Sequence, residues 1–296
     1  MKRAWNIIWK IALAMGAVGI VLTLIGLKLG PPQPIAWGPH GPKVMDVGDV
    51  GVSENNLAPF DKIVADAETL DIRVETGDHY GLQISAAATY MEVTWTNENG
   101  TLKIDQTGNN PFIMNFWYDS WSAVVTVPAG VTLTSVDVTD SAGNVTLGAP
   151  ATTVALKTSV GDVTLAATAD KATVQTQAGN ARVEADVNDL VATSSTGDVV
   201  VHGNSGTVRA ETSAGNVTVT GSATNVDATT STGDVTVTLT APWAATTYKV
   251  RTSLGDVRFA GPGAPPSDDR NSQVASPQLT LTATTSMGNI RVTLGA

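Results

Sequence analysis

The amino-acid sequence predicts an all-β protein folded as a parallel β-solenoid, a stack of repeated two-strand units. The first indication is a fixed period, because glycines recur every 18 residues at Gly143, Gly161, Gly179, Gly197, Gly215 and Gly233. Self-similarity at one period is typical of solenoids. Gly255 and Gly288 continue the series after insertions. An antiparallel β-sandwich is the alternative fold, but it does not require a constant period.

The second indication is an alternation of apolar and polar residues around each glycine. Apolar residues stand two and four positions after the glycine, and five and seven positions before it, as in Val163, Leu165, Leu156 and Val154. This period of two is typical of strands with one buried face. Two strands cannot bury that face alone, so successive repeats are expected to stack about 4.8 Å apart. We call each stacked repeat a rung.

The third indication is the corner between the two strands, where most repeats have Ser-x-Gly followed by Asp or Asn. The residues after the glycines alternate strictly, as Asn144, Asp162, Asn180, Asp198, Asn216 and Asp234. Stacking then separates the carboxylates by about 9.6 Å instead of about 4.8 Å, which halves their Coulomb repulsion. We therefore interpret the corner residues as a structural ladder. Calcium is the alternative, as in glycine–aspartate β-rolls, but one carboxylate per two rungs supplies too few oxygen ligands.

The N-terminal segment predicts a membrane anchor. Residues 11–28 contain an uncharged apolar run from Ile11 to Leu27, which as a helix rises about 25 Å. Basic residues precede this run, so the stub formed by residues 1–10 is expected in the cytoplasm and the body outside. A cleaved signal peptide is the alternative, although no small-x-small cleavage site is evident.

Three further regions follow the anchor. Residues 29–56 are rich in proline and glycine and predict an extended, semi-rigid linker. Residues 57–130 predict a capping β region, in which Asn99-Gly100 indicates a tight hairpin turn and Gly77-Asp78 indicates an early corner. Residues 131–296 contain the regular solenoid repeats.

Aromatic residues are few, at 5% of the chain, and a cluster of them precedes the regular repeats. This cluster consists of Phe112, Phe116, Trp117, Tyr118 and Trp121. We expect either a hydrophobic cap on the first rung, which solenoids need, or a platform for a carbohydrate or protein partner. Trp243, in a later insertion, is a further candidate for partner binding, and a second insertion spans residues 261–270.

The remaining composition argues against several chemistries. The formal net charge is −10, with +4 on residues 1–28 and −14 on the rest, so no nucleic-acid partner is expected. There is no cysteine, and the three histidines are scattered. No nucleophile, zinc or phosphate-loop motif is present. We therefore predict no catalytic residues, no metal and no cofactor.

The chain resembles a bacterial family of unknown function with β-strand repeats, the "putative adhesin" proteins. The match is carried by Phe60-Asp61-Lys62-Ile63, Leu70 to Val74, Val125-Thr126-Val127-Pro128 and the later corners, and it covers about residues 58–296. The resemblance implies a β-solenoid at the bacterial cell surface, often behind a membrane segment. It supplies no catalytic residues.

These observations favour a non-enzymatic, membrane-anchored surface protein that presents a rigid β-solenoid for adhesion or scaffolding. An envelope-stress sensing or regulatory module that acts through membrane partners is the alternative. A polysaccharide lyase is a third hypothesis, but it lacks the expected clustered acids and bases. Expected partners are the membrane, a cell-wall glycan or a surface protein. Self-association is also expected through Ile290 to Leu294, which we predict to form an exposed terminal rung.

Overall fold

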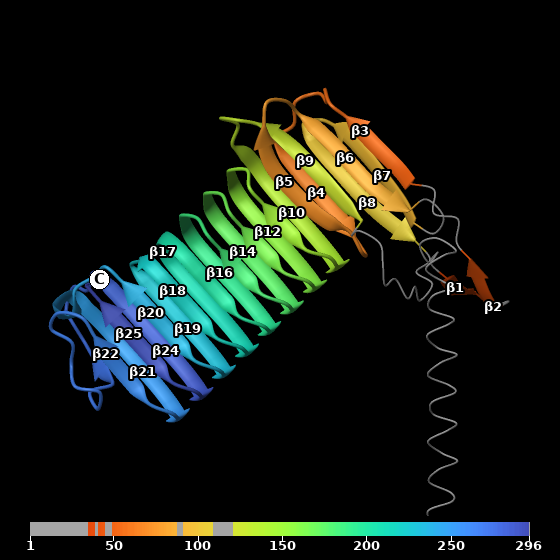
Figure 1. Ribbon diagram of the computed structural model, residues 1–296. Helices are drawn as coiled ribbons and strands as arrows, with labels where there is room; N and C mark the ends of the chain where they lie inside the picture. The colour runs from red at the N-terminus through yellow and green to blue at the C-terminus, as the bar shows by residue number, and fades with distance from the viewer. Residues whose placement is uncertain (1–34, 39–40, 45–48, 88–90, 109–120, 296) are drawn as a thin grey trace, which may run out of the picture. The chain divides into compact units, whose positions relative to one another are not determined.

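The computed structural model describes residues 35–38, 41–44, 49–87, 91–108 and 121–295. The predicted transmembrane helix, residues 11–28, lies outside these ranges. Within them, no helix has the length and apolar character needed to cross a bilayer. The described chain is almost entirely β-structure (Figure 1), with a single 3-10 turn, η1, at Trp243–Ala245. The predicted all-β class is therefore confirmed.

The chain divides into two units, each described by itself. The described part of the first unit is an antiparallel pair formed by β1 (Ile35–Gly38) and β2 (Gly41–Val44). Both strands lie within the region predicted as an extended linker. The second unit contains all the other strands.

The middle of the second unit is a regular stack of parallel rungs, each formed by two consecutive strands. The strands are β10 (Leu133–Ala142), β11 (Val145–Leu147), β12 (Ala151–Val160), β13 (Val163–Leu165), β14 (Ala169–Ala178), β15 (Ala181–Val183), β16 (Val187–Thr196), β17 (Val199–Ala214), β18 (Val217–Ser222), β19 (Asn225–Thr232) and β20 (Val235–Leu239). Parallel partners lie 18 residues apart, as in Val136 with Val154 and Val145 with Val163. This register confirms the predicted parallel solenoid. β17 spans two rungs because it pairs with β16 and β19 in one sheet and with β15 and β18 in the other.

At the N-terminal end, the rungs do not follow chain order. β4 (Lys62–Ala67) and β5 (Asp71–Gly77) pair with β10 and β11 on one side. On the other side they pair with the later strands β8 (Thr101–Gly108) and β9 (Ser122–Pro128). The β4–β5 rung is therefore enclosed.

Antiparallel strands finish this N-terminal end. β6 (Gly81–Ala87) pairs with β9, β7 (Met91–Glu98) pairs with β8, and β3 (Asp49–Glu54) lies beside β6. The predicted hairpin turn is confirmed, since Asn99 and Gly100 have φ of 52° and 74° between paired Glu98 and Thr101.

The corner predicted at Gly77-Asp78 is wrong. Gly77 ends β5, where it pairs with Pro128 of β9. The corner of this rung lies between β4 and β5, where Asp71 takes the polar position and no glycine precedes it. Without the glycine, the pattern at this corner did not resemble that of the later repeats.

At the C-terminal end, chain order is broken again. β24 (Leu279–Met287) and β25 (Ile290–Leu294) pair with β19 and β20 on one side. On the other side they pair with β21 (Thr246–Leu254) and β22 (Val257–Ala260). Ile290–Leu294 is thus enclosed between β20 and β22 (Figure 1), and the prediction of an exposed terminal rung is wrong. The last rung in space is formed by β21 and β22.

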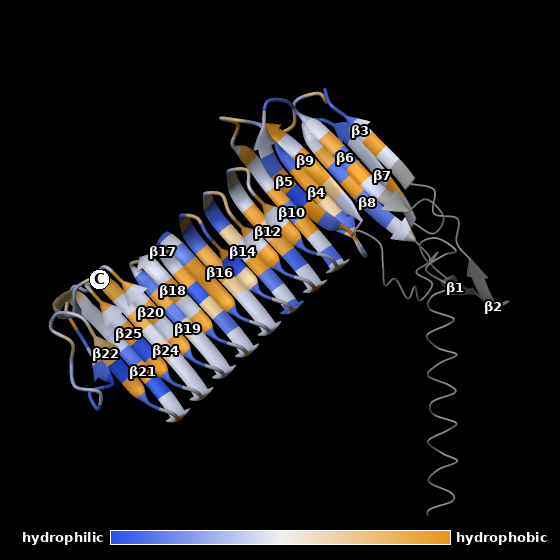
Figure 2. Cartoon of the chain, in the orientation of Figure 1, coloured by the Kyte–Doolittle hydropathy of each residue, from blue (hydrophilic) through white to orange (hydrophobic). Residues whose placement is uncertain are grey.

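A single apolar core runs through the stack. Each middle rung contributes alternating buried residues, as in Val154, Leu156, Val163 and Leu165, and apolar positions recur from rung to rung in Figure 2. A fully buried Val or Leu stabilises the folded state by about 1.5–3 kcal/mol relative to exposure, which offsets much of the entropy lost on ordering a rung.

Candidate functional site

The corner residues form a continuous hydrogen-bonded ladder. Each corner side chain except that of the last rung accepts, through Oδ1, the backbone N–H of the corner residue in the next rung, at 2.7–3.0 Å. In stacking order the ladder is Asp71, Asn144, Asp162, Asn180, Asp198, Asn216, Asp234, Asn289 and Asp256. Asp and Asn alternate without exception, although Asp234 and Asp256 are consecutive corners in the sequence. The enclosed C-terminal rung therefore supplies the missing Asn289.

The alternation has a chemical reason beyond charge spacing. The Nδ2 amide of each ladder asparagine donates to the aspartate before it, at 3.1–3.3 Å in the pairs led by Asn144, Asn180, Asn216 and Asn289. An aspartate in place of asparagine lacks this donor and adds a charge next to another carboxylate. The predicted structural role of the ladder is supported by these contacts. Within the described ranges, no group of three or more potential ligands is arranged for a metal ion.

The glycines and threonines beside the ladder make a second set of contacts between rungs. The hydroxyl groups of Thr176, Ser194, Thr212 and Thr230 each donate to the carbonyl oxygen of the corner glycine in the previous rung, at 2.9 Å. A Cβ atom on Gly179 would lie 2.0 Å from the carbonyl oxygen of Gly161. Glycine is therefore required by the close approach of the backbones as well as by its positive φ of 148°.

Asp140 departs from this column. It is aligned with Thr158 but belongs to the first regular rung, where it is 2% exposed. Its Oδ1 accepts the backbone N–H of Ala142 at 3.4 Å, whereas Oδ2 has no hydrogen-bond partner within the described part of the chain. Burial raises the pKa of Asp140 to about 6, with a smaller contribution from the charge of Asp71.

A second, shorter ladder lies at the turns between rungs. Asp186 Oδ1 accepts the backbone N–H of Asn204 at 2.7 Å, and Asn204 Oδ1 accepts the hydroxyl of Ser222 at 2.7 Å. A groove of about 460 Å³ crosses these turns, with Asp186 and Asn204 in its lining. Some of the polar side chains that line the groove are hydrogen-bonded across neighbouring rungs. Like the corner ladder, these side chains hold adjacent rungs together.

The predicted aromatic cluster is only partly described. Phe112, Phe116, Trp117 and Tyr118 lie outside the described residues. Trp121 is partly buried and packs against the core, and its carbonyl oxygen accepts the N–H of Asp71 at 2.8 Å. These contacts suit the capping interpretation.

Trp243 belongs to an aromatic group at the opposite end of the stack. It is 6% exposed, and its ring contacts Tyr248 and Phe259 edge-on, with centroids 5.5 and 5.2 Å away. The indole Nε1–H donates to the carbonyl oxygen of Ala260 at 2.9 Å. Trp243 therefore covers the core at the last rung, and little of its ring is accessible to a partner.

Within the described part of the chain, neither histidine takes part in a catalytic triad. His40 lies outside the described residues. The Nδ1 of His79 contacts the carboxylate of its neighbour Asp78, and His202 is exposed on β17. Nothing in these contacts brings a serine and a carboxylate to one imidazole.

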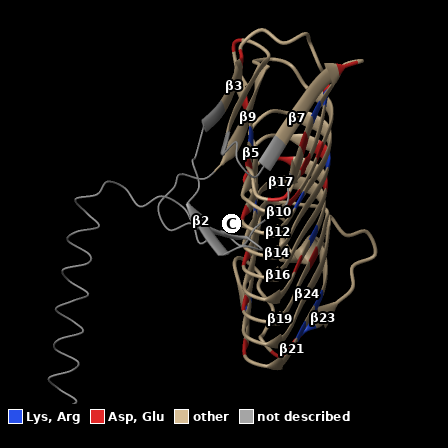
Figure 3. Ribbon diagram, turned by 90° about the vertical axis from the view of Figure 1, so that its right-hand side faces the viewer, with Lys and Arg blue, Asp and Glu red and all other residues tan. Residues whose placement is uncertain are grey.

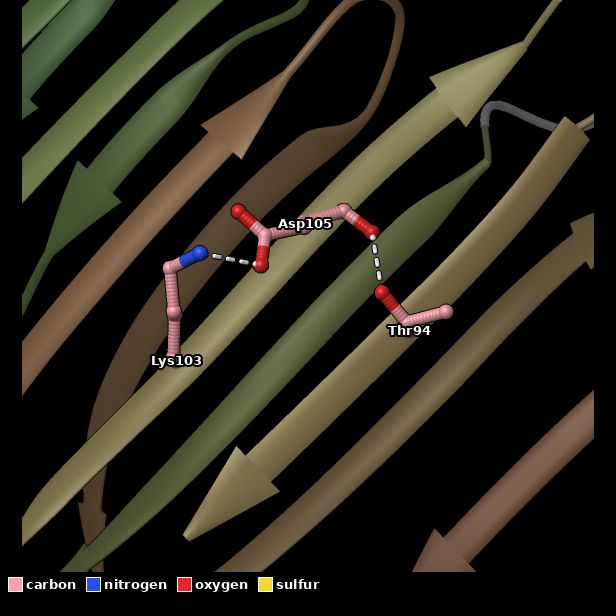
Figure 4. Close-up of polar contacts among 3 residues, drawn as sticks. All are labelled: Thr94, Lys103 and Asp105. Atoms are coloured by element: carbon pink, nitrogen blue, oxygen red, sulfur yellow. Dashed lines mark hydrogen bonds and ion pairs between the residues drawn. The ribbon is translucent and has the colours of Figure 1, made fainter. Parts of the chain in front are cut away.

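Charged residues on the outward faces of the strands are often paired within the stack. Figure 4 shows Lys103 on β8, whose Nζ lies 2.6 Å from Asp105 Oδ2, two residues further along. The hydroxyl of Thr94 on β7 donates to the Asp105 carbonyl oxygen at 3.5 Å. Arg182 with Glu184 and Arg209 with Glu211 repeat this spacing, at 3.4 and 2.7 Å. Sequence reasoning did not single out these pairs, although a base followed two residues later by an acid is visible in the strands.

Among known proteins, residues 60–293 match the family described as Toastrack DUF4097. A crystal structure of a "putative adhesin" from Bacteroides fragilis is similar over 83% of this chain and 97% of that chain, at 15% identity and a TM-score of 0.43. A "putative lipid binding protein" from Parabacteroides distasonis has 12% identity and a TM-score of 0.40, over 84% of this chain and 98% of that chain.

A "putative adhesin" from Parabacteroides merdae has 12% identity and a TM-score of 0.39, over 83% of this chain and 95% of that chain. No curated protein matches the sequence. These TM-scores are below 0.5, so the assignment of the chain rests on the family match.

Proposed function

We propose that this chain, which belongs to the Toastrack DUF4097 family, is a non-enzymatic, membrane-anchored surface protein that presents a rigid β-solenoid, in an adhesin-like or scaffolding role. The observation that supports the proposal most is the continuous corner ladder. It bonds every rung from the β4–β5 rung to the β21–β22 rung to its neighbour, at the same position in each.

Such a ladder suits a spacer better than an enzyme. The corner carboxylates and amides bond to backbone N–H groups and to one another, so they are not arranged around a substrate. The apolar N-terminal run supports a single-pass anchor, with the N-terminus in the cytoplasm and the body outside the membrane. Two of the similar solved structures are named putative adhesins, which agrees with a surface role, but the proposal does not depend on these names.

The location is tested with the full chain carrying a C-terminal epitope, expressed in a bacterium. We expect the epitope to be digested by protease added to cells whose outer barrier has been opened, and the chain to remain in the membrane after a high-salt wash. Mass spectrometry of the N-terminus separates an uncleaved anchor from a cleaved signal peptide. Protection of the epitope in intact protoplasts would contradict the proposed orientation.

The activity is tested by capture with the detergent-purified full chain. We expect retention on cell-wall glycans or on intact cells, without change in the length of the glycans. Recovery of defined membrane proteins in place of glycans would instead support the regulatory alternative. Reproducible glycan turnover would overturn the non-enzymatic proposal.

A further inference from the structure

The C-terminal end of the stack differs in charge from residues 49–240, which form most of the stack. Residues 49–240 contain seven Lys or Arg and 23 Asp or Glu, a net charge of −16. Residues 241–296 contain five Lys or Arg and three Asp, a net charge of +2. In Figure 3, basic positions appear beside β23, next to the last rung. This end of the stack, which comprises the last rung, its insertion and the enclosed β24–β25 rung, is therefore a cationic region on an acidic body.

Three of these cations surround one groove. Lys249 and Arg251 are exposed on the outward face of β21, two residues apart. Arg270 comes from the insertion that precedes β23 (Asn271–Ser272), and its carbonyl oxygen accepts the N–H of Val250 at 2.9 Å. The insertion is thereby held along the outer edge of β21. All three cations line a groove of about 510 Å³, together with hydroxyl groups that include Thr284 and Ser286.

The cations of this groove have no acidic partners of the kind seen elsewhere. In the stack, Arg182 and Arg209 each have a glutamate two residues further along, whereas Lys249 has the second cation Arg251 at that spacing. Within the described ranges, no ion pair includes Lys249, Arg251 or Arg270.

The acids nearest in sequence or register, Asp268, Asp269 and Asp227, are not among the lining residues. No carboxylate lines the groove. Asp269, next to Arg270, is absent from the lining, and its charge helps burial to raise the pKa of Tyr248. Asp227 stands in the same outward column as Lys249 but two rungs away, with Thr282 between them. The positive charges therefore reinforce one another at the groove.

We propose that this groove binds a phosphate-bearing oligoanion, and that it is the ligand-binding site at the β21–β22 end of the stack in the surface protein proposed above. Two guanidinium groups and one ammonium group provide charge-assisted donors, and guanidinium suits the paired oxygens of phosphate. Threonine and serine hydroxyls supply further donors to the remaining oxygens. The phosphate groups come from a soluble or cell-wall polymer or from a lipid headgroup, because both present the same chemistry.

Binding is measured by calorimetry on the full chain in a non-ionic detergent, with tripolyphosphate as the probe. We expect saturable binding that weakens as salt is raised, because the contacts are largely electrostatic. The variants Lys249→Gln, Arg251→Gln and Arg270→Gln should each weaken binding by roughly tenfold or more, as expected for the loss of a charge-assisted hydrogen bond.

The matched control is Lys157→Gln. Lys157 stands in the same outward column as Arg251, in the middle of the stack, so its removal changes the net charge equally without touching the groove. It should leave binding unchanged. Thr284→Lys, which adds a cation beside Arg251, should tighten binding and does not depend on the folding of the neutralised variants.

Mixed micelles of the detergent with phosphatidylglycerol, compared with a soluble glycerol phosphate polymer at equal phosphate concentration, distinguish the two sources of phosphate. Tighter binding to the micelles assigns the site to lipid headgroups, and tighter binding to the soluble polymer assigns it to a polymer. No saturable binding of either probe, or an equal loss in Lys157→Gln, would overturn the proposal. Retention on cells that persists in the three groove variants would also overturn it, while leaving the proposed surface role intact.

Discussion

Between β10 and β20, each rung pairs with the repeat that follows it in the chain, whereas at both ends of the stack the pairing departs from chain order. The β4–β5 rung is enclosed between β10–β11 and the later strands β8–β9. The β24–β25 rung is enclosed between β19–β20 and the earlier strands β21–β22. The middle can thus be built from local repetition, while the ends require segments distant in sequence.

The two arrangements meet the same physical requirement. A terminal rung would expose one side of its core and a row of unpaired backbone groups. Antiparallel strands β6 and β7 pair with the outermost rung at the N-terminal end. At the C-terminal end, Trp243, Tyr248 and Phe259 pack together and cover the core. Repetition supplies the length of the stack, and irregular segments close it.

The largest expected effect comes from removing the enclosed C-terminal rung. A chain that stops after Gln278 lacks β24 and β25 and leaves β21 and β22 without their parallel partners. Five apolar residues of the missing rung that are larger than alanine are at most 1% exposed, which corresponds to on the order of 10 kcal/mol of lost burial. The lost residues are Leu279, Leu281, Ile290, Val292 and Leu294. We expect the last part of the stack to unfold, as measured by urea denaturation and limited proteolysis.

The contrasting variant deletes residues 162–197, two whole repeats from the middle. The deletion joins Gly161 to Asp198, so the 18-residue register and the Asn–Asp alternation are both kept. We expect this chain to fold cooperatively although it loses more residues. If the truncated chain were the more stable of the two, the proposed difference between middle and ends would not hold.

The next largest effect is expected for Gly179→Ala in the middle of the stack. The added Cβ would meet the Gly161 carbonyl oxygen at 2.0 Å, and neither backbone can move without disturbing its own rung. Together with the positive φ, this should lower the free energy of unfolding by about 3–5 kcal/mol.

Gly130→Ala is the control for this substitution, because Gly130 has φ of 87° but no atom within 4 Å of the added Cβ. It should cost about 1–2 kcal/mol. Chemical denaturation of both variants measures the two free energies of unfolding. Equal costs would show that conformation alone, and not stacking, selects glycine at the corners.

Asp140→Thr tests the boundary between the N-terminal end and the middle. Because the folded-state pKa of Asp140 is about 6 and the unfolded value is about 3.9, the folded state holds the proton more tightly. Protonated Asp140 therefore contributes about 3 kcal/mol to the free energy of unfolding below about pH 4, and this contribution is lost as the pH rises through about 6. Threonine at this position does not ionise, so the loss of stability with rising pH disappears. It also supplies the hydroxyl that Thr158 and Thr176 use to contact the previous rung.

We therefore expect Asp140→Thr to raise the free energy of unfolding by about 1–3 kcal/mol at pH 7.5. The gain should shrink toward pH 4. Asp140→Asn, which removes the titration without supplying a hydroxyl, separates the two contributions. Urea denaturation between pH 4 and 8 provides the measurement, and a gain that does not depend on pH would contradict the role given to burial.

The smallest expected effect comes from Asn289→Asp. In the stack, Asn289 lies between Asp234 and Asp256, so the variant places three carboxylates in consecutive rungs and removes the Nδ2 donor. The ladder is solvent-exposed, so we expect a loss of roughly 1–2 kcal/mol at low salt, reduced by added salt.

Asn180→Asp, between Asp162 and Asp198, should cost about the same, because the surroundings of the two residues are equivalent in space. Asp256→Asn should cost less, since it adds no charge. Differential scanning calorimetry at two salt concentrations measures the stability of the three variants. A much smaller effect at Asn289 than at Asn180 would indicate that the C-terminal rung is not enclosed.

The regular part of this fold could be predicted from the sequence because the repeat carries it locally. The corner glycine, the apolar positions and the Asn–Asp alternation each recur at a fixed distance, so the parallel register and the structural role of the ladder followed. The enclosed end rungs could not be predicted in the same way, since pairing between Ile290 and Val257 depends on closure of the whole stack.

One signal of the enclosed C-terminal rung was present in the sequence. Asp234 and Asp256 are consecutive corners without an asparagine between them, and Asn289 is the residue that restores the alternation. The cationic groove was harder to foresee, because Arg270 reaches Lys249 and Arg251 only through the path of the insertion. The first corner, at Asp71, was missed because no glycine marks it.

The enclosed position of β24 and β25 also bears on how the protein is made. Residues 279–294 leave the ribosome after β21 and β22, yet they must take their place between β20 and β22 before the stack is continuous. β21 and β22 can therefore pair with the rest of the stack only after β24 and β25 have been synthesised. As a result, the cationic groove should form only in chains synthesised through Leu294, and a prematurely terminated chain would lack it.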